Sequence, residues 1–139
     1  MYELLEHQSE VGIKACGNTI IEAFQEASIA LCSIMCNPES ILLHETTNII
    51  VKGNNYEELF AALMNEIISI TSINNAFYSK HEYAIHEDNG MIILEGVLSG
   101  EKIDAEKHEL RTEPKAATYS GLKVWEENDD TCVQIIIDV

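Results

Sequence analysis

The sequence is short of positive charge. Its 139 residues include 24 aspartates and glutamates but only 8 lysines and arginines, which gives a formal net charge of −16 at pH 7. Binding to nucleic acid depends on lysine and arginine neutralising backbone phosphates, so direct nucleic-acid binding is not expected as the main activity. A cation or a basic protein partner is the natural complement of such an acidic surface.

The sequence also lacks a membrane segment and a leader. No apolar run reaches the roughly 20 residues that cross a bilayer, and the first ten residues, MYELLEHQSE, are acidic where a secretory leader needs positive charge. We therefore expect a cytoplasmic protein with no membrane partner. A reducing compartment predicts that all four cysteines, Cys16, Cys32, Cys36 and Cys132, are free thiols. Cys32 and Cys36 lie one helical turn apart, and without a second cysteine or histidine pair to complete a zinc site they are predicted to be buried core thiols.

Motifs of the common catalytic sites are missing as well. The chain contains no G-x-S-x-G nucleophile turn, no phosphate-binding glycine loop and no H-E-x-x-H zinc motif. His81, His86 and His108 are scattered among acidic residues without the spacing of metal ligands, and we expect them to face solvent. The sequence therefore favours a protein that is not itself an enzyme.

Hydrophobic periodicity divides the chain into two helices and seven strands. Helical spacing of apolar residues covers 18–35 and 54–75, where Thr19 with Glu22 and Asn55 with Glu58 supply N-terminal caps. Short or alternating apolar runs predict strands at 2–7, 10–17, 45–53, 76–87, 91–100, 115–127 and 131–139. This order predicts one domain, residues 1–139, with an α+β fold: a single-domain sandwich in which two helices pack on mainly antiparallel sheet. The 46% hydrophobic content is enough for a core.

The two ends of the chain contain the most suggestive acidic residues. HQSEVGI, at 7–13, places Glu10 at the start of a strand, and the final IIIDV places Asp138 beside the α-carboxylate of Val139. If the strand at 10–17 lies beside the last strand, three carboxylates share one small volume. Three negative charges so close together repel one another, and a bound cation relieves the repulsion. Glu10, Asp138 and Val139 are therefore the predicted metal ligands. The alternative is that these acids lie at solvated strand ends.

Two further residues are candidates for a supporting role at this site. His7 is close to Glu10 in sequence, although a lone histidine is more often a hydrogen-bonded residue at a strand edge than a ligand. Lys115 opens a predicted strand and is either a surface lysine or a partner that holds the carboxylates together.

The sequence resembles the archease family over nearly its full length. Four stretches carry the likeness: HQSEVGI at 7–13, the helix at 19–35, Gly100-Glu101 leading through Asp104 and His108 to PKAATYSGLKV, and the terminal IIIDV. The first and the last are the more specific, because family members typically show a histidine, an acidic residue before V-G-I, and an aspartate followed by a small aliphatic residue at the end.

The resemblance implies an accessory protein of the RtcB-type tRNA-splicing ligase. Such a protein promotes loading of GMP onto the ligase and permits multiple turnover without joining RNA itself. The resemblance also implies a divalent cation, Ca²⁺ before Mg²⁺ or Mn²⁺, bound by Glu10, Asp138 and main-chain oxygens of Val139. The family usually has aspartate at position 10, so Glu10 coordinates from an arm one methylene longer, and Ser120 stands where the family commonly has histidine. The second function that the family suggests is an acidic, chaperone-like protein-binding module that modulates a tRNA-modifying methyltransferase.

Overall fold

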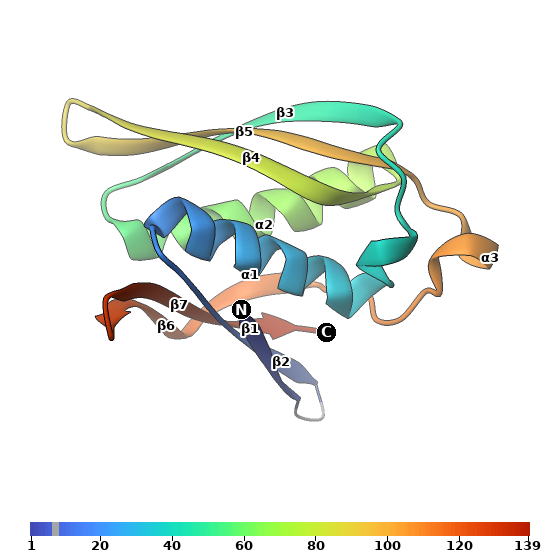
Figure 1. Cartoon of the computed structure of the whole chain (residues 1–139), viewed down its shortest axis with the longest axis horizontal. Helices are drawn as coiled ribbons and strands as arrows, with labels where there is room; N and C mark the ends of the chain where they lie inside the picture. The colour runs from blue at the N-terminus through green and yellow to red at the C-terminus, as the bar shows by residue number, and fades with distance from the viewer. Residues whose placement is uncertain (7–8) are drawn as a thin grey trace.

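Two antiparallel sheets enclose a layer of helices in the computed structural model, which describes residues 1–6 and 9–139 (Figure 1). One sheet of the described chain has the strand order β1-β2-β7-β6, and the other has the order β3-β5-β4. The strands are β1 (Tyr2–Glu6), β2 (Glu10–Gly17), β3 (Glu45–Gly53), β4 (Ala76–Asp88), β5 (Met91–Lys102), β6 (Ala116–Glu127) and β7 (Asp130–Asp138). The long helices are α1 (Ile20–Met35) and α2 (Tyr56–Asn74), and the short ones are a 3₁₀ turn (Pro38–Ser40) and α3 (Ala105–His108). The predicted α+β sandwich is confirmed.

Both long helices begin at the predicted caps. The Thr19 hydroxyl accepts a hydrogen bond from the Glu22 main-chain N–H at 3.1 Å, and the Glu22 carboxylate accepts one from the N–H of Asn18 at 2.8 Å. The second helix repeats this arrangement, since the Asn55 side chain accepts from the Glu58 N–H at 2.8 Å. These bonds satisfy N–H groups that have no partner within the first turn.

The helices form the middle layer of the molecule, and this explains the breadth of their buried surface. In α1, ten residues from Ala23 to Met35 are buried, which is far more than one apolar stripe. A helix that packs against a single sheet needs one apolar stripe, whereas a helix between two sheets is buried on nearly all sides. Phe24 of α1 and Phe60 of α2 stack with ring centroids 5.3 Å apart at the centre of this layer.

Turns and one close approach fix the sheets locally. The predicted turns are present: Asn89 and Gly90 have φ of 53° and 80°, and Asn128 and Asp129 have φ of 51° and 71°. Gly100 lies opposite the irregularity in β4, where a Cβ atom would collide with the main-chain oxygen of Phe77. None of the described helices is long and apolar enough to span a membrane.

Candidate functional site

Glu10 and Asp138 lie directly opposite each other on neighbouring strands. β2 and β7 pair antiparallel, and Glu10 is in register with Asp138. Residues paired in this way project from the same face of a sheet, with Cβ atoms about 4.5–5.5 Å apart. The adjacent pair, Val11 and Ile137, is buried in the core. Because successive side chains alternate, the two carboxylates project from the outer face of the sheet, away from the helices.

Main-chain hydrogen bonds hold the end of the chain in this position. The N–H of Val139 donates to the carbonyl oxygen of Ser9 at 3.1 Å, and the N–H of Lys115 donates to the carbonyl oxygen of Asp138 at 2.8 Å. The last two residues are thus bonded on one side to the start of β2 and on the other to the segment that enters β6. The strand pairing that the predicted metal site requires is present.

The two carboxylates are left without a charged partner among the described residues. Neither Glu10 nor Asp138 forms an ion pair with a described lysine, arginine or histidine. Lys115 lies beside Asp138 through its main chain, and its exposed side chain makes no ion pair with a described carboxylate; pairing with the carboxylates was the second of the two roles considered for it. Like charges directly opposite in an antiparallel pair are destabilising, which leaves this corner suited to a cation.

The oxygen atoms gathered here are of the kind that hard divalent cations bind. Ca²⁺ takes carboxylate and main-chain oxygens, often with water completing its shell. Two carboxylates are in register, and the Val139 oxygens follow directly. No group of three or more histidine, cysteine, aspartate or glutamate side chains in residues 1–6 and 9–139 is placed to hold a metal. Metal binding by Glu10, Asp138 and Val139 stays a prediction, and His7 lies outside the described residues.

A disulfide at the other end of the same strand pair corrects the cysteine prediction. Cys16 of β2 and Cys132 of β7 are in register, 116 residues apart in sequence, and their sulfur atoms are bonded at 2.14 Å. The prediction of free thiols is wrong for this pair, because strand register sets the two side chains opposite each other. Cys32 and Cys36 are free and buried, as predicted, with their Sγ atoms 3.9 Å apart.

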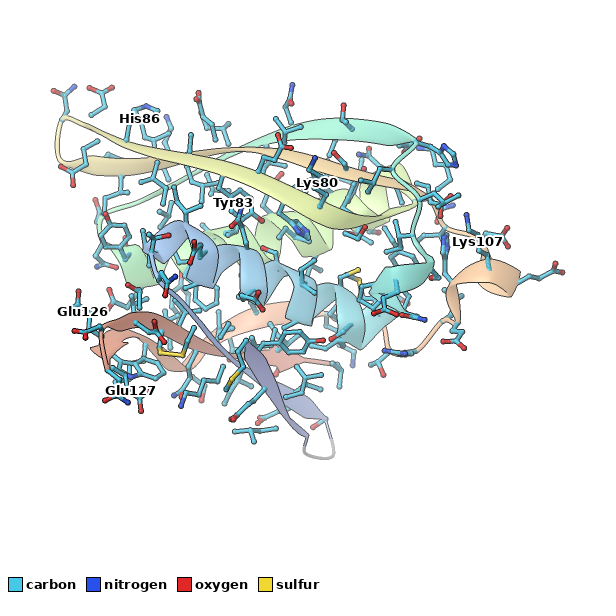
Figure 2. All side chains as sticks on the ribbon, viewed as in Figure 1. Lys80, Tyr83, His86, Lys107, Glu126 and Glu127 are labelled. Atoms are coloured by element: carbon cyan, nitrogen blue, oxygen red, sulfur yellow. A yellow bond between two sulfur atoms is a disulfide. The ribbon has the colours of Figure 1, made fainter. Side chains whose placement is uncertain are left out.

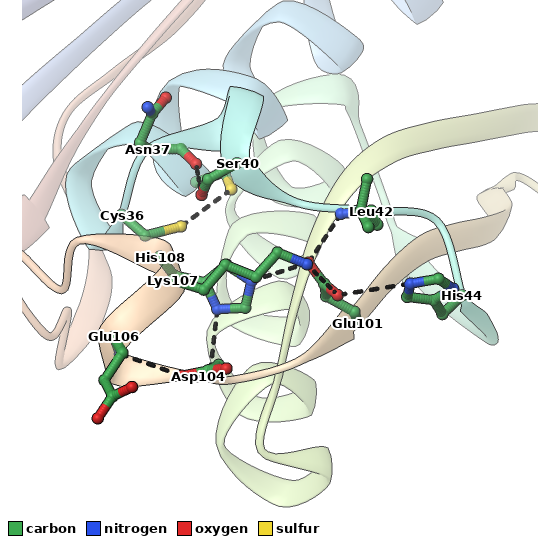
Figure 3. Close-up of polar contacts among 11 residues, drawn as sticks. Cys36, Asn37, Ser40, Leu42, His44, Glu101, Asp104, Glu106, Lys107 and His108 are labelled. Carbon is green, nitrogen blue, oxygen red and sulfur yellow. Dashed lines mark hydrogen bonds and ion pairs between the residues drawn. The ribbon is translucent and has the colours of Figure 1, made fainter.

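A second polar cluster surrounds Glu101 near the end of β5 (Figure 3). The Glu101 carboxylate accepts hydrogen bonds from the His108 Nε2–H at 2.9 Å, the Lys107 ammonium at 2.9 Å and the Leu42 main-chain N–H at 2.8 Å. His108 is fully buried, and its Nδ1 accepts from the Asp104 N–H at 2.9 Å. The cluster therefore ties α3 and the segment before β3 to β5.

Hydrogen bonding decides the charge of this cluster. The bonds from His108, then Lys107 and Leu42, lower the pKa of Glu101 to about 2, so the carboxylate is ionised throughout the neutral range. Both oxygens of the Glu101 carboxylate accept hydrogen bonds from groups of the chain, so the cluster has a structural role. The prediction that His108 faces solvent is wrong. The fold brings Glu101 and the segment at Leu42 together around it, and these contacts are not visible in the local sequence.

His81 is also buried, contrary to the prediction. It is 5% exposed on the inner face of β4, and its carbonyl oxygen accepts a hydrogen bond from the Gln25 side chain of α1 at 2.9 Å. Its Nε2 has no hydrogen-bond partner among the described residues, and burial lowers the pKa of His81 to about 4. His86, farther along the strand, is exposed as predicted; Figure 2 shows Tyr83 pointing toward the helices and His86 pointing away.

Comparisons with known proteins agree with this architecture. The chain matches the model of the Archease protein family (MTH1598/TM1083) over residues 2–139. It is 32% identical over 123 residues to the protein archease of Pyrococcus furiosus, covering 88% of this chain and 87% of that protein. The protein archease of Sulfurisphaera tokodaii is 29% identical over 138 residues, covering 99% and 98%.

Two solved structures share the fold. The solution structure of Methanobacterium thermoautotrophicum protein 1598 matches with a TM-score of 0.86 at 24% identity, covering 99% of this chain and 98% of that one. A crystal structure from Thermotoga maritima, named an archease and possible chaperone, matches with a TM-score of 0.61 at 21% identity, covering 100% and 98%.

Proposed function

Because the chain belongs to the archease family, we propose that it activates an RtcB-type RNA ligase in tRNA splicing, promoting guanylylation of the ligase over many turnovers. The observation that carries this proposal is the register of Glu10 with Asp138, which puts two carboxylates, neither of them ion-paired with a described residue, beside the chain terminus. The protein contributes no nucleophile in this role. Its contribution is positional and electrostatic, and its place of action is the cytoplasm.

The carboxylates act by holding a divalent cation, with Ca²⁺ expected first and Mg²⁺ or Mn²⁺ as alternatives. Such an ion, when bound, supplies positive charge for the phosphates of the nucleotide in the ligase pocket. Glu10 and Asp138 would hold it from neighbouring strands, and the main-chain bonds at Ser9 and Lys115 keep the strand ends from separating. The net charge of −16 favours docking on a basic protein surface.

Guanylylation of a purified RtcB-type ligase tests the proposal. The ligase is mixed with GTP, a divalent metal, the RNA ends that it joins and a substoichiometric amount of this protein, and ligase–GMP formation and RNA joining are followed over many turnovers. We expect clear acceleration by the wild-type chain and its loss in Glu10→Gln and Asp138→Asn. Glu95→Gln is the matched control, since Glu95 is an exposed acid of β5 in the opposite sheet. No acceleration by the wild-type chain would refute the proposal.

A second candidate function is a chaperone-like module that modulates a tRNA-modifying methyltransferase. The acidity of the chain supports it, as does the name of the Thermotoga maritima protein, possible chaperone. This function does not need the carboxylate pair, so Asp138→Ala should leave binding to the methyltransferase intact in a pull-down. Loss of binding in that variant would count against this second function.

A further inference from the structure

The Cys16–Cys132 disulfide borders a hollow at one end of the β1-β2-β7-β6 sheet. Both cysteines line this hollow, which has a volume of 520 Å³ and lies between the start of α1 and the turn that joins β6 to β7. Cys16 is partly exposed, whereas Cys132 is 1% exposed. Thiol–disulfide exchange depends on access to a sulfur atom. Because the bond lies at an open surface, a thiol reaches it from the Cys16 side while the protein stays folded.

The side of attack decides which sulfur leaves. A thiolate that attacks the Cys16 Sγ expels the Cys132 sulfur as a thiolate. The Cys132 Sγ lies 3.9 Å from a carboxylate oxygen of Glu127, and the Lys14 ammonium lies 3.7 Å from the same oxygen. A carboxylate disfavours a thiolate beside it, because the two charges have the same sign. Glu127 therefore slows the exchange, and its ion pair with Lys14 offsets part of that effect.

The hollow around the bond is negatively charged. It is lined by two positive groups, the Lys14 ammonium and the Met1 amino group, and by the carboxylates of Glu22, Glu26, Glu127 and Asp130. Met1 pairs with Glu26 at 3.0 Å and Lys14 pairs with Glu127, which leaves the other two carboxylates without an ion pair among the described residues. The remaining negative charge repels an anionic thiol and admits a neutral or cationic one.

The bond cross-links the two strands that carry Glu10 and Asp138. Cys16 lies six residues along β2 from Glu10, so both project from the outer face of the sheet. The bond joins residues 116 positions apart, and such a cross-link stabilises the fold by restricting the unfolded chain. The main-chain hydrogen bonds between β2 and β7 do not depend on it. Opening the bond therefore leaves the fold in place at a lower stability.

We propose that the Cys16–Cys132 bond is a redox switch of the β2–β7 strand pair, which neutral or cationic thiols open in the folded protein and which anionic thiols attack more slowly. The assignment goes beyond the ligase proposal and does not need it. The cytoplasm, the proposed place of action, contains thiol reductants. An accessible disulfide is exposed to them there, whereas an enclosed one is not.

The reductant is a dithiol. Its thiolate attacks the Cys16 Sγ, the Sγ–Sγ bond breaks, and Cys132 leaves with the electron pair and takes a proton from water. The second sulfur of the dithiol, after losing its proton, attacks the mixed disulfide and releases Cys16, which is protonated in turn. Two electrons have then passed to the protein, and the dithiol has become a cyclic disulfide. An excess of that cyclic disulfide reverses the reaction.

The fluorescence of Trp125, the only tryptophan of the chain, reports on the bond. Trp125 of β6 is in register with Cys132, and a disulfide quenches an indole beside it. The full chain is mixed with dithiothreitol at neutral pH, and alkylation followed by mass measurement counts the thiols formed. We expect fluorescence to rise at a rate proportional to the dithiothreitol concentration, with unchanged far-ultraviolet circular dichroism. A rate independent of that concentration, or a bond that opens only in denaturant, would overturn the proposal.

Two monothiols test the charge selection. Cysteamine carries an ammonium and 3-mercaptopropionate carries a carboxylate, and each rate is divided by the rate of the same thiol with neutral bis(2-hydroxyethyl) disulfide. At low salt the normalised rate of cysteamine should be roughly fivefold higher or more, and the ratio should fall at high salt. Glu127→Gln should raise the rate of 3-mercaptopropionate roughly threefold, whereas Glu95→Gln, the matched control in the opposite sheet, leaves it unchanged. Equal normalised rates of the two thiols at low salt, or equal rates in the two variants, would overturn the charge selection.

Thermal unfolding tests the effect of the bond on the strands. The reduced wild type should unfold roughly 5 °C or more below the oxidised one, and oxidised dithiothreitol should restore the original midpoint. Cys16→Ser combined with Cys132→Ser is the control, because it has no bond to open and should unfold at one midpoint with or without dithiothreitol. An unchanged midpoint of the reduced wild type would overturn the switch. None of these measurements contains a ligase, so their outcome is independent of the proposed function.

Discussion

The stability of this protein should fall between pH 6.5 and pH 4.5 because His81 is buried in its neutral form. Burial lowers the pKa of His81 from 6.5 to about 4. The unfolded chain takes up a proton below pH 6.5, whereas the folded protein resists it until about pH 4. The stabilisation is therefore fully present above pH 6.5 and is lost as the pH falls toward 4, because the unfolded state binds more protons throughout this window.

The size of the effect follows from the shift. A fall in the pKa of His81 from 6.5 to about 4 corresponds to roughly 3 kcal/mol of stability in full. Most of this is lost by pH 4.5. The depressed pKa of Glu101 acts in the same direction but over a lower window, from its ordinary value of 4.5 down to about 2. Measurements above pH 4.5 therefore report mainly on His81.

Urea unfolding at half-unit pH steps from 7.5 to 4.5 measures this loss. His81→Leu replaces the titrating group by an apolar side chain of similar volume. It breaks no hydrogen bond of Nε2, because that atom has no partner among the described residues. His86→Leu, at an exposed position of the same strand, is the control. Acidification also reduces the self-repulsion of a chain with net charge −16, so the decisive quantity is the difference in slope between variants. Equal slopes for the wild type and His81→Leu would refute the reasoning.

Three further outcomes are expected. Glu10→Ala or Asp138→Ala should lower divalent-cation affinity roughly tenfold or more in calorimetric titration, because each removes an oxygen ligand, and unchanged affinity in both would contradict the site. Without metal the same variants should be more stable by roughly 0.5 kcal/mol, because two like charges no longer face each other. Cys132→Ser should lower the free energy of unfolding by roughly 2–4 kcal/mol, since it opens a cross-link that spans 116 residues; non-reducing peptide mapping verifies the bond, and an unchanged denaturation midpoint would argue against it. Gly100→Ala should destabilise the fold by at least about 2 kcal/mol, because its Cβ would meet the Phe77 main chain, and a wild-type thermal midpoint would show that the strands can separate there.

Local features of the fold were predictable because their causes lie within a few residues. The caps at Thr19 and Asn55 are bonds between groups three residues apart, and the turn at Asn89 depends on residues that tolerate positive φ. Hydrophobic periodicity likewise separates helix from strand over single segments. The element order, the α+β class and the acidic residues at both chain ends followed from such short-range chemistry.

The outcomes for the histidines and cysteines show where sequence reasoning failed. His81 and His108 are surrounded by charged residues in sequence, yet packing of β4 on α1 buries the first and the Glu101 cluster encloses the second. Cys16 and Cys132 are bonded because they are in register across two strands. In each case the residue that buries or bonds the side chain is remote in sequence. Composition and local patterns do not reveal which remote segments pack together.

The sequence by itself determined the two long helices, the approximate course of the seven strands, the net charge and the presence of acidic residues before V-G-I and at the terminus. The short helices at Pro38–Ser40 and Ala105–His108 were not predicted. The tertiary structure decided that Glu10 lies opposite Asp138, that both helices are covered on two sides, and that Cys16 lies opposite Cys132. The physical reason is that strand register and layer order are set by the summed burial of side chains across the whole chain, and one residue of slippage would turn every paired side chain to the other face.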